Sequence, residues 1–541
     1  MPPLTRSLEI RARVAPRPEP PFDRLHDPLV EDMTRGGEFS RARFATHWAD
    51  TAALQRLAEA KRAALGPRLC EELAEYHRRL GASDASLESL ELMRRGEGVC
   101  AVAGQQPAPL GGPLYSLHKT ACAAGLAAAV TARLGLPCVP LFWMHGEDSD
   151  FAEIRGAALA DASLKVREIA LPDGAHRDGG LVGSIPIRPL AELSEQALGL
   201  WAGLPAQAET SALVRRSLAR ARDHGEAYSA LMLALFGERG LVVIDPRLPA
   251  FRAAARPIID RYLATAEELH AAARRAGELL EKHTARRPLS DSALDSFVFA
   301  IEDATRRKLS VAEARSVGPG RVLSPSVALR AVVQDGVFPT VAMACGSAEI
   351  TYLAQLREVF EGLGVDAACA VPRLSATWLP PPAVALLDAS GCGAWEIVTG
   401  ADGVLKRLAE REVPADVRTE LENARVQALS GLERFGSAAQ RLDPSLLQLV
   451  DSARAKLDYQ YARLLEGLIG KVRNRLERRH PEWLRLRYYL LPGDRLQERR
   501  LASLEVVAHR GVRVALELCS LAEEQARRLE RGAHEHLLLE L

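Results

Sequence analysis

The chain has 541 residues, of which 48% are hydrophobic and 26% are charged. These proportions are typical of folded globular proteins and exclude collagen-like, low-complexity and wholly disordered chains. Lys and Arg together number 70, as do Asp and Glu, so the formal net charge is zero. This balance argues against a chain-wide basic surface for nucleic acid or an anionic membrane, and the length predicts two or three domains.

The eight cysteines and the N-terminal residues indicate a soluble, cytoplasmic protein. No two cysteines have CxxC spacing, so the sequence offers no zinc site, and we expect no resident metal. We expect free, buried thiols, as in a reducing compartment. Residues 1–21 contain no apolar core of a signal peptide, and no run of 18 apolar residues occurs in the chain. We therefore expect neither a signal peptide nor a membrane span.

The first predicted elements are helices, followed by a strand–helix–strand unit. Residues 50–95 are rich in Ala, Leu, Arg and Glu and predict helices broken near Gly81. Residues 99–103 predict a buried strand, residues 113–134 an Ala-rich helix, and residues 138–144 a second buried strand. Such units build parallel sheets through right-handed crossovers.

Two further apolar runs extend this alternation. Residues 240–245 predict a strand that ends in an acidic residue, and residues 337–344 predict a strand that leads into a helix. We interpret residues 323–335 as a loop entering that last strand. Alternation of strands and helices over residues 95–390 predicts a doubly wound α/β core.

From about residue 400 the strand pattern ends and the sequence becomes helical. Apolar residues then recur every three or four positions, at Leu446, Val450, Ala453, Leu457, Tyr461, Leu464, Leu468, Val472 and Leu476. This stripe predicts one long amphipathic helix. With residues 415–440 before it and a break at Asp443-Pro444, we expect an antiparallel helical pair.

The first candidate site is the turn between the first predicted strand and its helix. Gly111 and Gly112 would let an anion approach the backbone at the helix N-terminus. Lys119 could neutralise a phosphate, and His118 could donate to one or move a proton near pH 7. The spacing matches neither Walker A nor GxGxxG. The alternative is that the glycines permit tight packing and that His118 is a structural histidine.

An acidic cluster follows the second predicted strand. Glu147, Asp148 and Asp150 place three carboxylates within four residues. Carboxylates at this spacing repel one another unless a cation joins them, and a substrate ammonium, Mg²⁺ or an Arg would be the natural partner. The alternative is a solvated helix start, where the helix dipole favours negative charge.

Polar residues also follow the later strands. Gly346 opens a predicted helix, and Glu349 and Tyr352 share one of its faces by their spacing. Glu349 is either a capping residue or a ligand for an amine or a ribose hydroxyl. Arg373 stands at the end of an apolar run, where it either clamps a carboxylate or phosphate or belongs to a structural ion pair.

These stretches, taken in order, resemble one family, the cysteine-adding enzymes of bacillithiol biosynthesis. The matching segments are GQQ (104–106), GGPLYSLHK (111–119), PLFWMHGEDSDF (140–151), GLVVID (240–245), ALRAVVQD (328–335) with FPT (338–340), GSAEITYLAQL (346–356), VPRLS (371–375) and LQER (496–499). The resemblance implies an α/β fold: a Rossmann-like parallel-sheet ligase core with an inserted α-helical coiled-coil domain, related in architecture to class I aminoacyl-tRNA synthetases. It implies a homodimer that adds L-cysteine to the amine of glucosaminyl-malate, the last step of bacillithiol biosynthesis.

The resemblance also implies domain limits and residue roles. The core would comprise residues 1–393, the coiled-coil domain 394–499, and a returning C-terminal segment 500–541. Catalytic roles would fall to His118, Lys119, Asp148 and Asp150, substrate contacts to Gln105, Tyr115, Glu147, Glu349, Tyr352, Gln355 and Arg373, and nucleotide contacts to Gly104, Gly111, Gly112 and Gly346. The helix end would hold developing phosphate charge, the acidic cluster the cysteine ammonium or a proton from the sugar amine, and Arg373 the malate carboxylates. The resemblance suggests an adenine nucleotide, ATP or ADP, as the activating cofactor.

The sequence departs from the family pattern at a few positions. Ser149 stands where the family usually has His, residues 345–347 read Cys-Gly-Ser where Gly-Gly-Pro is usual, and Ser326 and Ala331 replace Asn and Pro. The change at 149 removes a possible acid or base. The departures at 149 and 345–347 motivate a second hypothesis, that the protein is a nucleotide-binding or assembly homologue that has lost ligase chemistry and dimerises through its helices.

Overall fold

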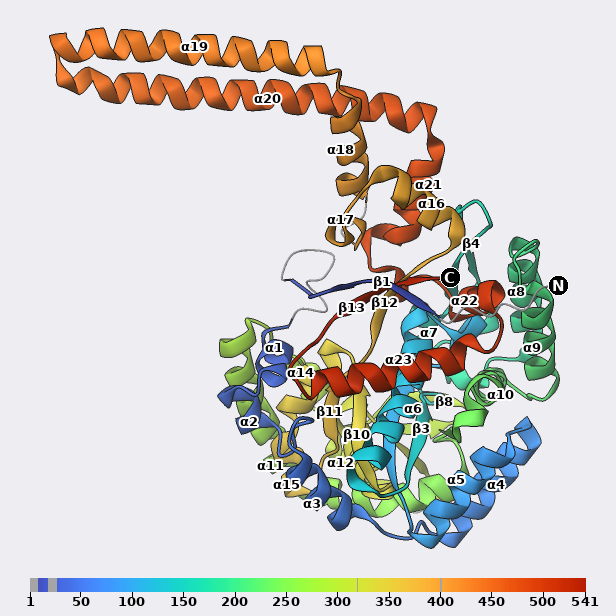
Figure 1. Ribbon diagram of the computed structural model, residues 1–541. Coiled ribbons are helices and arrows are strands. Elements are labelled where there is room, and N and C mark those ends of the chain that lie inside the picture. Colours follow the sequence, from blue (N-terminus) through green and yellow to red (C-terminus); the bar gives the residue numbers. More distant parts are fainter. Residues whose placement is uncertain (1–7, 18–26, 319, 399–400) are drawn as a thin grey trace. The chain divides into compact units, whose positions relative to one another are not determined.

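The computed structural model describes residues 8–17, 27–318, 320–398 and 401–541 (Figure 1). Contacts divide the chain into two compact units, one made of residues 1–162, 166–380 and 495–541 and the other of residues 163–165 and 381–494. These limits fall before the predicted limits at 393 and 499. The prediction that no signal peptide is present falls partly on residues 1–7 and 18–26, which lie outside the described residues.

The first unit holds all the strands that the structure describes. They are β1 (Glu9–Val14), β2 (Val99–Gln105), β3 (Cys138–Met144), β4 (Gly156–Ala160), β5 (Val166–Ala170), β6 (Val242–Ile244), β7 (Val298–Glu302), β8 (Thr305–Lys308), β9 (Val322–Pro325), β10 (Thr340–Cys345), β11 (Cys369–Pro372), β12 (Ser375–Leu379) and β13 (His536–Glu540). The helices of this unit are α1 (Pro28–Thr34), α2 (Glu38–Arg43), α3 (Thr51–Lys61), α4 (Pro67–Leu80), α5 (Asp84–Arg95), α6 (Leu114–Leu134), α7 (Phe151–Ile154), α8 (Ile187–Leu200), α9 (Gln207–Ala219), α10 (His224–Phe236), α11 (Pro249–Thr284), α12 (Val311–Ser316), α13 (Val327–Val337), α14 (Ser347–Gln355), α15 (Arg357–Gly362), α22 (Ser503–Arg510) and α23 (Val514–Leu529).

A parallel sheet of five strands, in the order β11-β10-β2-β3-β6, forms the centre of this unit. In its register Val102 pairs with Leu141 on one side and Met343 on the other. The carboxyl ends of β2, β3, β10 and β11 therefore meet at one edge, where open α/β sheets bind ligands. Smaller sheets have the orders β1-β13-β12, β8-β7-β9 and β4-β5. The predicted Rossmann-like α/β class is confirmed.

Alternate residues of β3 face two different helical layers, as the pleat of a strand requires. The ring of Phe142 lies 5.9 Å from that of Tyr228 on α10, while the ring of Trp143 lies 5.1 Å from that of Phe251 on α11. The Ala-rich helix α6 covers the α10 side and packs against α23 (Figure 1). A side chain at Gly125 would place its Cβ 2.6 Å from the backbone nitrogen of Glu523, so this close helix contact requires glycine.

Residues 323–335 do not form the predicted loop. They contain the end of β9 and most of helix α13, and β10 consequently starts at Thr340 rather than at 337. Ser326 begins the helix, because its hydroxyl oxygen accepts a hydrogen bond from the backbone N–H of Ala328 (3.3 Å). Within the segment interpreted as a loop, Ser324 and Pro325 end β9, and Ser326 caps α13.

The second unit is helical. It contains α16 (Pro381–Ser390), α17 (Ala394–Val398), α18 (Ala401–Glu412), α19 (Ala415–Leu442), α20 (Leu447–Arg479) and α21 (Pro481–Leu490). The predicted antiparallel pair is confirmed as α19 and α20, which lie side by side (Figure 1). Arg425 donates to Asp458 (3.0 Å), and a Cβ at Gly436 would lie 3.2 Å from Val450. Most of the predicted stripe is partly covered, whereas Leu464 is 60% exposed.

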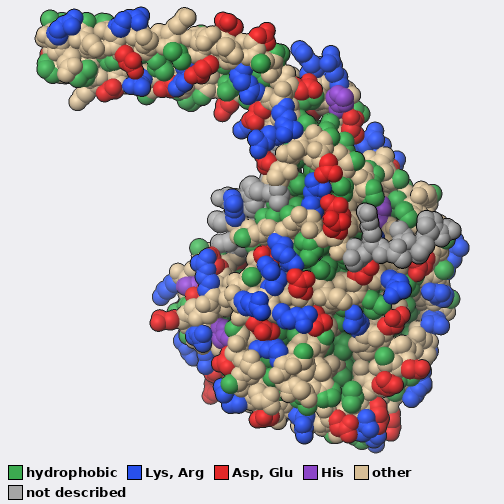
Figure 2. Space-filling model, in the orientation of Figure 1, with side chains coloured by type: hydrophobic (Ala, Val, Ile, Leu, Met, Phe, Trp, Pro, Cys, Tyr) green, Lys and Arg blue, Asp and Glu red, His purple; other side chains and the backbone are tan. Residues whose placement is uncertain are grey.

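Charges of both signs are interspersed over the face seen in Figure 2. This mixture agrees with the formal net charge of zero. Within the described ranges, no helix combines the length and the apolar composition that crossing a membrane requires.

Candidate functional site

A cavity of about 310 Å³ lies at the carboxyl ends of β2, β3, β10 and β11. Its lining includes the cations Lys119, Arg330, Arg373 and Arg499, the carboxylates Asp148, Glu153 and Glu349, and Gln105, Gln106, Tyr115, His145, Gly346, Ser347 and Tyr352. Both signs of charge thus surround one space, which suits a small substrate that carries both. Among the described residues, no three His, Cys, Asp or Glu side chains gather as they would around a metal ion.

Lys119 joins the end of β2 to the start of α14 across the cavity. Its ammonium donates to the carbonyl oxygen of Gly104 (3.0 Å) and to Oε1 of Gln105 (3.3 Å), and it lies 2.7 Å from Oε2 of Glu349. The same Glu349 oxygen accepts the backbone N–H of Gly346 (2.8 Å). Glu349 is therefore both a capping residue and a partner for an amine, and these contacts use all three ammonium protons of Lys119.

Tyr115 forms another wall of the cavity. Its hydroxyl accepts a hydrogen bond from Nε2 of Gln105 (3.1 Å), and the guanidinium carbon of Arg373 lies 5.5 Å from the centre of its ring. Burial raises the pKa of Tyr115 to about 12, so this phenol stays protonated near neutral pH. It can hold a substrate oxygen or nitrogen by a hydrogen bond.

His118 belongs to a buried network and does not line the cavity. The indole N–H of Trp378 donates to Nε2 of His118 (3.0 Å), so Nδ1 carries the proton and donates to Glu498 (3.1 Å). Arg373 donates to both oxygens of Glu498, at 2.6 and 3.1 Å. Burial alone would raise the pKa of Glu498, but Arg373 and His118 hold it well below its usual range. The geometry fits the structural alternatives for His118 and Arg373, although Arg373 also borders the cavity.

The three carboxylates of the acidic cluster point to three different partners. Glu147 is buried, where its Oε1 accepts from Arg252 (2.7 and 3.1 Å) and its Oε2 from Ser324 (2.7 Å). Asp150 is exposed and caps α7 by accepting the backbone N–H of Glu153 (3.1 Å). Asp148 is the member of the cluster that lines the cavity, where its Oδ1 accepts the backbone N–H of Ser149 (2.7 Å) and lies 3.8 Å from Arg306. The bend between β3 and α7 separates residues that are adjacent in sequence.

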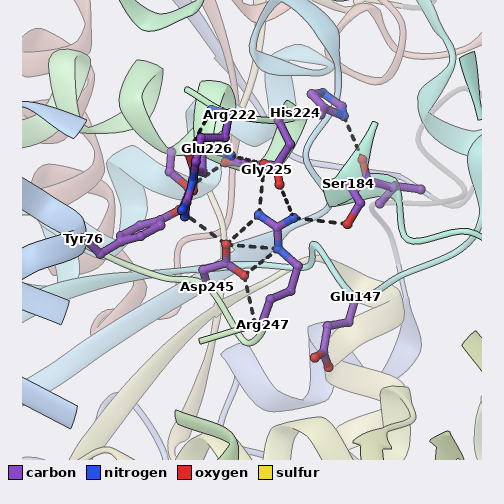
Figure 3. A network of polar contacts seen from close by, with 12 residues as sticks. Tyr76, Glu147, Ser184, Arg222, His224, Gly225, Glu226, Asp245 and Arg247 are labelled. Carbon is purple, nitrogen blue, oxygen red and sulfur yellow. Dashed lines mark hydrogen bonds and ion pairs between the residues drawn. The ribbon is translucent and has the colours of Figure 1, made fainter. Parts of the chain in front are cut away.

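A second polar network, centred on Arg247, lies close to the loop after β3 (Figure 3). Arg247 donates to Asp245 (2.7 Å) and to Asp223 (2.8 Å), and a Cβ at Gly146 would lie 3.3 Å from its Nε. Gly183 donates its N–H to the carbonyl of Gly146 (3.0 Å). Glycine at 146 thus lets the loop lie against Arg247.

The glycine turn before α6 lies outside this cavity. Gly111 and Gly112 have φ values of 81° and 72°, which favour glycine. The N–H of Ser503 donates to the carbonyl of Gly112 (2.7 Å), and the N–H of Leu114 donates to that of Leu501 (2.8 Å). The returning chain covers the turn, so these residues do not fit the phosphates of a nucleotide, and the geometry favours the tight-packing alternative.

Of the other predicted contact residues, one is buried away from the cavity and three lie at or beside it. Gln355 is fully buried, donates to the carbonyl of Ala273 (3.0 Å) and accepts the N–H of Leu289 (2.9 Å), so it anchors α14 to its neighbours. Tyr352 lines the cavity and shares a hydrogen bond with Arg330, and burial raises its pKa. Gly104 ends β2 beside the cavity, and Gly346 lies in its lining.

Several residues at the cavity were not singled out from the sequence. They are His145, Glu153, Arg330 and Arg499, together with Glu498 behind Arg373. All except Glu153 lie within the segments that resemble the cysteine-adding enzymes, so the motifs contained the signal. Burial raises the pKa of Glu153, and the nearby charges of Asp150 and Asp148 raise it further.

Comparison with protein families covers almost the whole chain. Residues 22–318 and 311–374 match the model described as "Bacillithiol biosynthesis BshC, N-terminal Rossmann-like domain", and residues 376–528 match "Bacillithiol biosynthesis BshC, C-terminal coiled-coil domain".

The chain belongs to the BshC family. Similar proteins named "Putative cysteine ligase BshC" come from Koribacter versatilis (29% identical, 73% of this chain and 76% of that protein) and Solibacter usitatus (29%, 76% and 80%). One from Geobacillus kaustophilus is 28% identical over 80% of this chain and 83% of its own length. The family predicted from the motifs is confirmed, and the names of these relatives agree with the predicted enzyme class, a ligase.

Proposed function

We propose that this protein is a cysteine ligase that joins the carboxyl group of L-cysteine to the amine of glucosaminyl-malate, the final step of bacillithiol synthesis. The observation that carries the proposal is the cavity at the sheet edge, where four cationic and three acidic side chains surround about 310 Å³. Cysteine carries an ammonium and a carboxylate, and glucosaminyl-malate carries an ammonium and two carboxylates. The name of the similar proteins, putative cysteine ligase, supports amide-bond formation as the reaction.

The charges of the cavity suggest how the substrates bind. Asp148 and Glu153 come from the loop after β3 and from α7 and would hold an ammonium group. We assign the malate carboxylates to Arg330 rather than to Arg373, because two hydrogen bonds hold Arg373 on Glu498. Lys119 keeps Glu349 and the end of β2 in place, so it would shape the cavity as much as it contributes charge.

Amide formation from a free carboxylate requires activation, for which the sequence resemblance suggests an adenine nucleotide. The turn at Gly111 and Gly112 does not fit its phosphates, because residues 501–503 cover that backbone. Gly104 and Gly346 remain beside the cavity. The assay should therefore be run both with and without a nucleotide.

The test is direct synthesis. Purified protein is incubated with L-cysteine and glucosaminyl-malate, with and without ATP and Mg²⁺, and the product is detected by mass. We expect a product with the mass of the two substrates minus one water. Lys119→Ala should reduce its formation by at least tenfold, whereas Lys282→Ala, at a distant helix end, should not. Absence of product under all nucleotide and metal conditions would contradict the proposal.

The second hypothesis, a homologue without ligase chemistry, rests on the departures at 345–347 and on Ser149 in place of a histidine. The cavity nevertheless contains an imidazole, because His145 lies in its lining. The loss at 149 therefore does not leave the cavity without an imidazole that could accept a proton.

We also propose a cytoplasmic homodimer. The helical pair carries large apolar side chains that are largely exposed, including Phe435 (62%), Leu442 (84%), Leu449 (68%) and Tyr459 (60%). Such side chains on a coiled-coil unit suit contact with a second copy. Light scattering of the full chain measures the oligomer, and a monomer at micromolar concentration would contradict this part of the proposal.

A further inference from the structure

His145 is half-buried, and its ring nitrogens are available, unlike those of the buried histidines His118 and His536. In His118 both nitrogens are bonded, to Trp378 and Glu498, and in His536 both are bonded, to Ser375 and Thr377. For the ring of His145, the described residues supply no hydrogen-bond partner, yet this ring borders the cavity. The half-buried ring therefore presents its nitrogens to the cavity, where they can bond to a ligand.

The position of this ring depends on Gly104. A Cβ added at Gly104 would lie 2.7 Å from Nε2 of His145, closer than real Cβ atoms approach a nitrogen. The ring occupies the space that a side chain at the end of β2 would fill. Gly104 lies outside the predicted nucleotide turn of Gly111 and Gly112. Its lack of a side chain leaves room for the ring of His145.

Charged groups from several elements surround His145. Burial lowers its pKa well below the ordinary value, and Arg330 on α13, Lys119 on α6 and Arg306 on β8 lower it further. Carboxylates also line the cavity: Asp148 in the same loop, Glu153 on α7 and Glu349 on α14. Burial and these cations together keep the imidazole neutral near pH 7, the form that can accept a proton.

We propose that His145 accepts a proton from the substrate ammonium before the amide bond forms. This inference rests on the proposed function, since amide formation is what requires a free amine. One N–H bond of R–NH₃⁺ breaks, its proton moves to the ring, and the products are R–NH₂ and an imidazolium. The freed lone pair on nitrogen is the pair that forms the C–N bond, and the imidazolium returns the proton to water. Gly104 is the positioning residue for this step.

The test compares His145→Gln with wild type in the synthesis assay. General-base catalysis typically contributes about 10²–10⁴-fold, so we expect a loss of kcat of about 100-fold or more with KM values within threefold. In the wild type, kcat/KM should fall at low pH only as His145 is protonated, whereas the variant must use substrate whose amine is already free, so its kcat/KM should already fall from higher pH. Free imidazole should restore part of the activity of His145→Gly. The control is His176→Gln, whose Nε2 is bonded to the carbonyl of Gly180 (2.7 Å) outside the cavity.

Gly104→Ala provides the second arm, because the closest atom to the added Cβ would be Nε2 of His145 (2.7 Å), ahead of the carbonyl oxygen of Trp143 (3.0 Å). We expect its loss of kcat to approach that of His145→Gln and the double variant to lose little more, since coupled residues are not additive. If His145→Gln is poorly folded by circular dichroism, His145→Asn and the imidazole rescue decide the matter. Active wild type with an unchanged pH profile in His145→Gln would overturn the inference alone, whereas inactive wild type would overturn the proposed function with it.

Discussion

Two groups of charges lie at the carboxyl ends of the same parallel sheet, and their surroundings differ. After β6, Arg247 is bonded to Asp245 and Asp223 (Figure 3). After β2, β3, β10 and β11, cations and carboxylates line a cavity of about 310 Å³. Both groups hold opposite charges at the edge where ligands bind in such folds.

The difference lies in how much space remains beside the charged side chains of each group. Around Arg247, a Cβ at Gly146, Gly183 or Gly225 would lie within 3.3 Å of the guanidinium, so backbone closes in on it. The cavity instead keeps space beside His145, Arg330 and Asp148. Charge at a sheet edge therefore does not by itself mark a site. Charges whose partners all belong to the chain hold the fold, and charges with remaining space can hold a substrate.

The largest expected effect on stability comes from removing the guanidinium of Arg247 from its ion pairs. Arg247→Met would leave the carboxylates of Asp245 and Asp223 without their guanidinium. Removing one member of a buried ion pair typically costs about 3–5 kcal/mol, and we expect the free energy of unfolding in urea to fall by that order. Arg330→Met, at the cavity, is the matched control and should cost less than about 1 kcal/mol. Equal losses of unfolding free energy in the two variants would contradict the distinction between the Arg247 ion pairs and the cavity.

Buried carboxylates without a cation allow a sharper test through pH. Glu505 is buried and accepts the N–H of Ala160 (2.7 Å), and burial raises its pKa from 4.5 to about 8. Between these values the folded protein holds a proton that the unfolded chain has released. Stability from this group is therefore greatest below pH 4.5 and is lost as the pH rises toward 8.

Glu505→Gln should remove that dependence. Between pH 5 and pH 8 we expect wild type to lose roughly 3 kcal/mol more of unfolding free energy than the variant. Urea unfolding at both pH values, on both proteins, measures the difference. A parallel pH dependence in the two proteins would mean that Glu505 ionises in the folded state as it does in water.

Sequence patterns predicted the core elements well because burial leaves a simple signal. Residues 138–144 form a continuous apolar run, as expected for a strand covered on both faces, and they match β3 in full. The stripe from 446 to 476 predicted α20 for the same kind of reason. Helix α13 was missed because Ser326, its cap, follows Pro325 in a segment that looks like a loop.

The site was predicted only in part, because sequence does not give side-chain partners. Lys119, Glu349, Gln105, Tyr115 and Asp148 do meet at the cavity. The partners that direct the remaining residues elsewhere come from distant segments: Glu498 for His118, Arg252 for Glu147, Leu289 for Gln355 and Ser503 for Gly112. A motif names residues near a site, but packing decides which of them face it.

A smaller effect is expected when the cavity itself is changed. Arg330→Met removes a cation that we assign to the malate carboxylates, so KM for glucosaminyl-malate should rise. A charge-assisted hydrogen bond is worth about 1.5–3 kcal/mol, which corresponds to roughly 10- to 150-fold. KM for L-cysteine should change less than threefold. Steady-state kinetics with each substrate varied in turn separates the two, and an equal rise in both KM values would contradict the assignment.

The smallest expected effect is that of Tyr115→Phe. This variant tests whether a cavity with remaining space can lose one hydrogen bond at little cost to activity. The hydroxyl accepts from Gln105 (3.1 Å), and the ring lies beneath the guanidinium of Arg373. Phenylalanine keeps the ring and leaves the Gln105 amide next to the cavity, where water can replace the hydroxyl. A net hydrogen bond is worth about 0.5–1.5 kcal/mol, so kcat/KM should fall about two- to tenfold with little change in stability. A loss beyond 100-fold would instead place the Tyr115 hydroxyl in direct contact with the reacting atoms, because only a bond made in the transition state would have so large an effect.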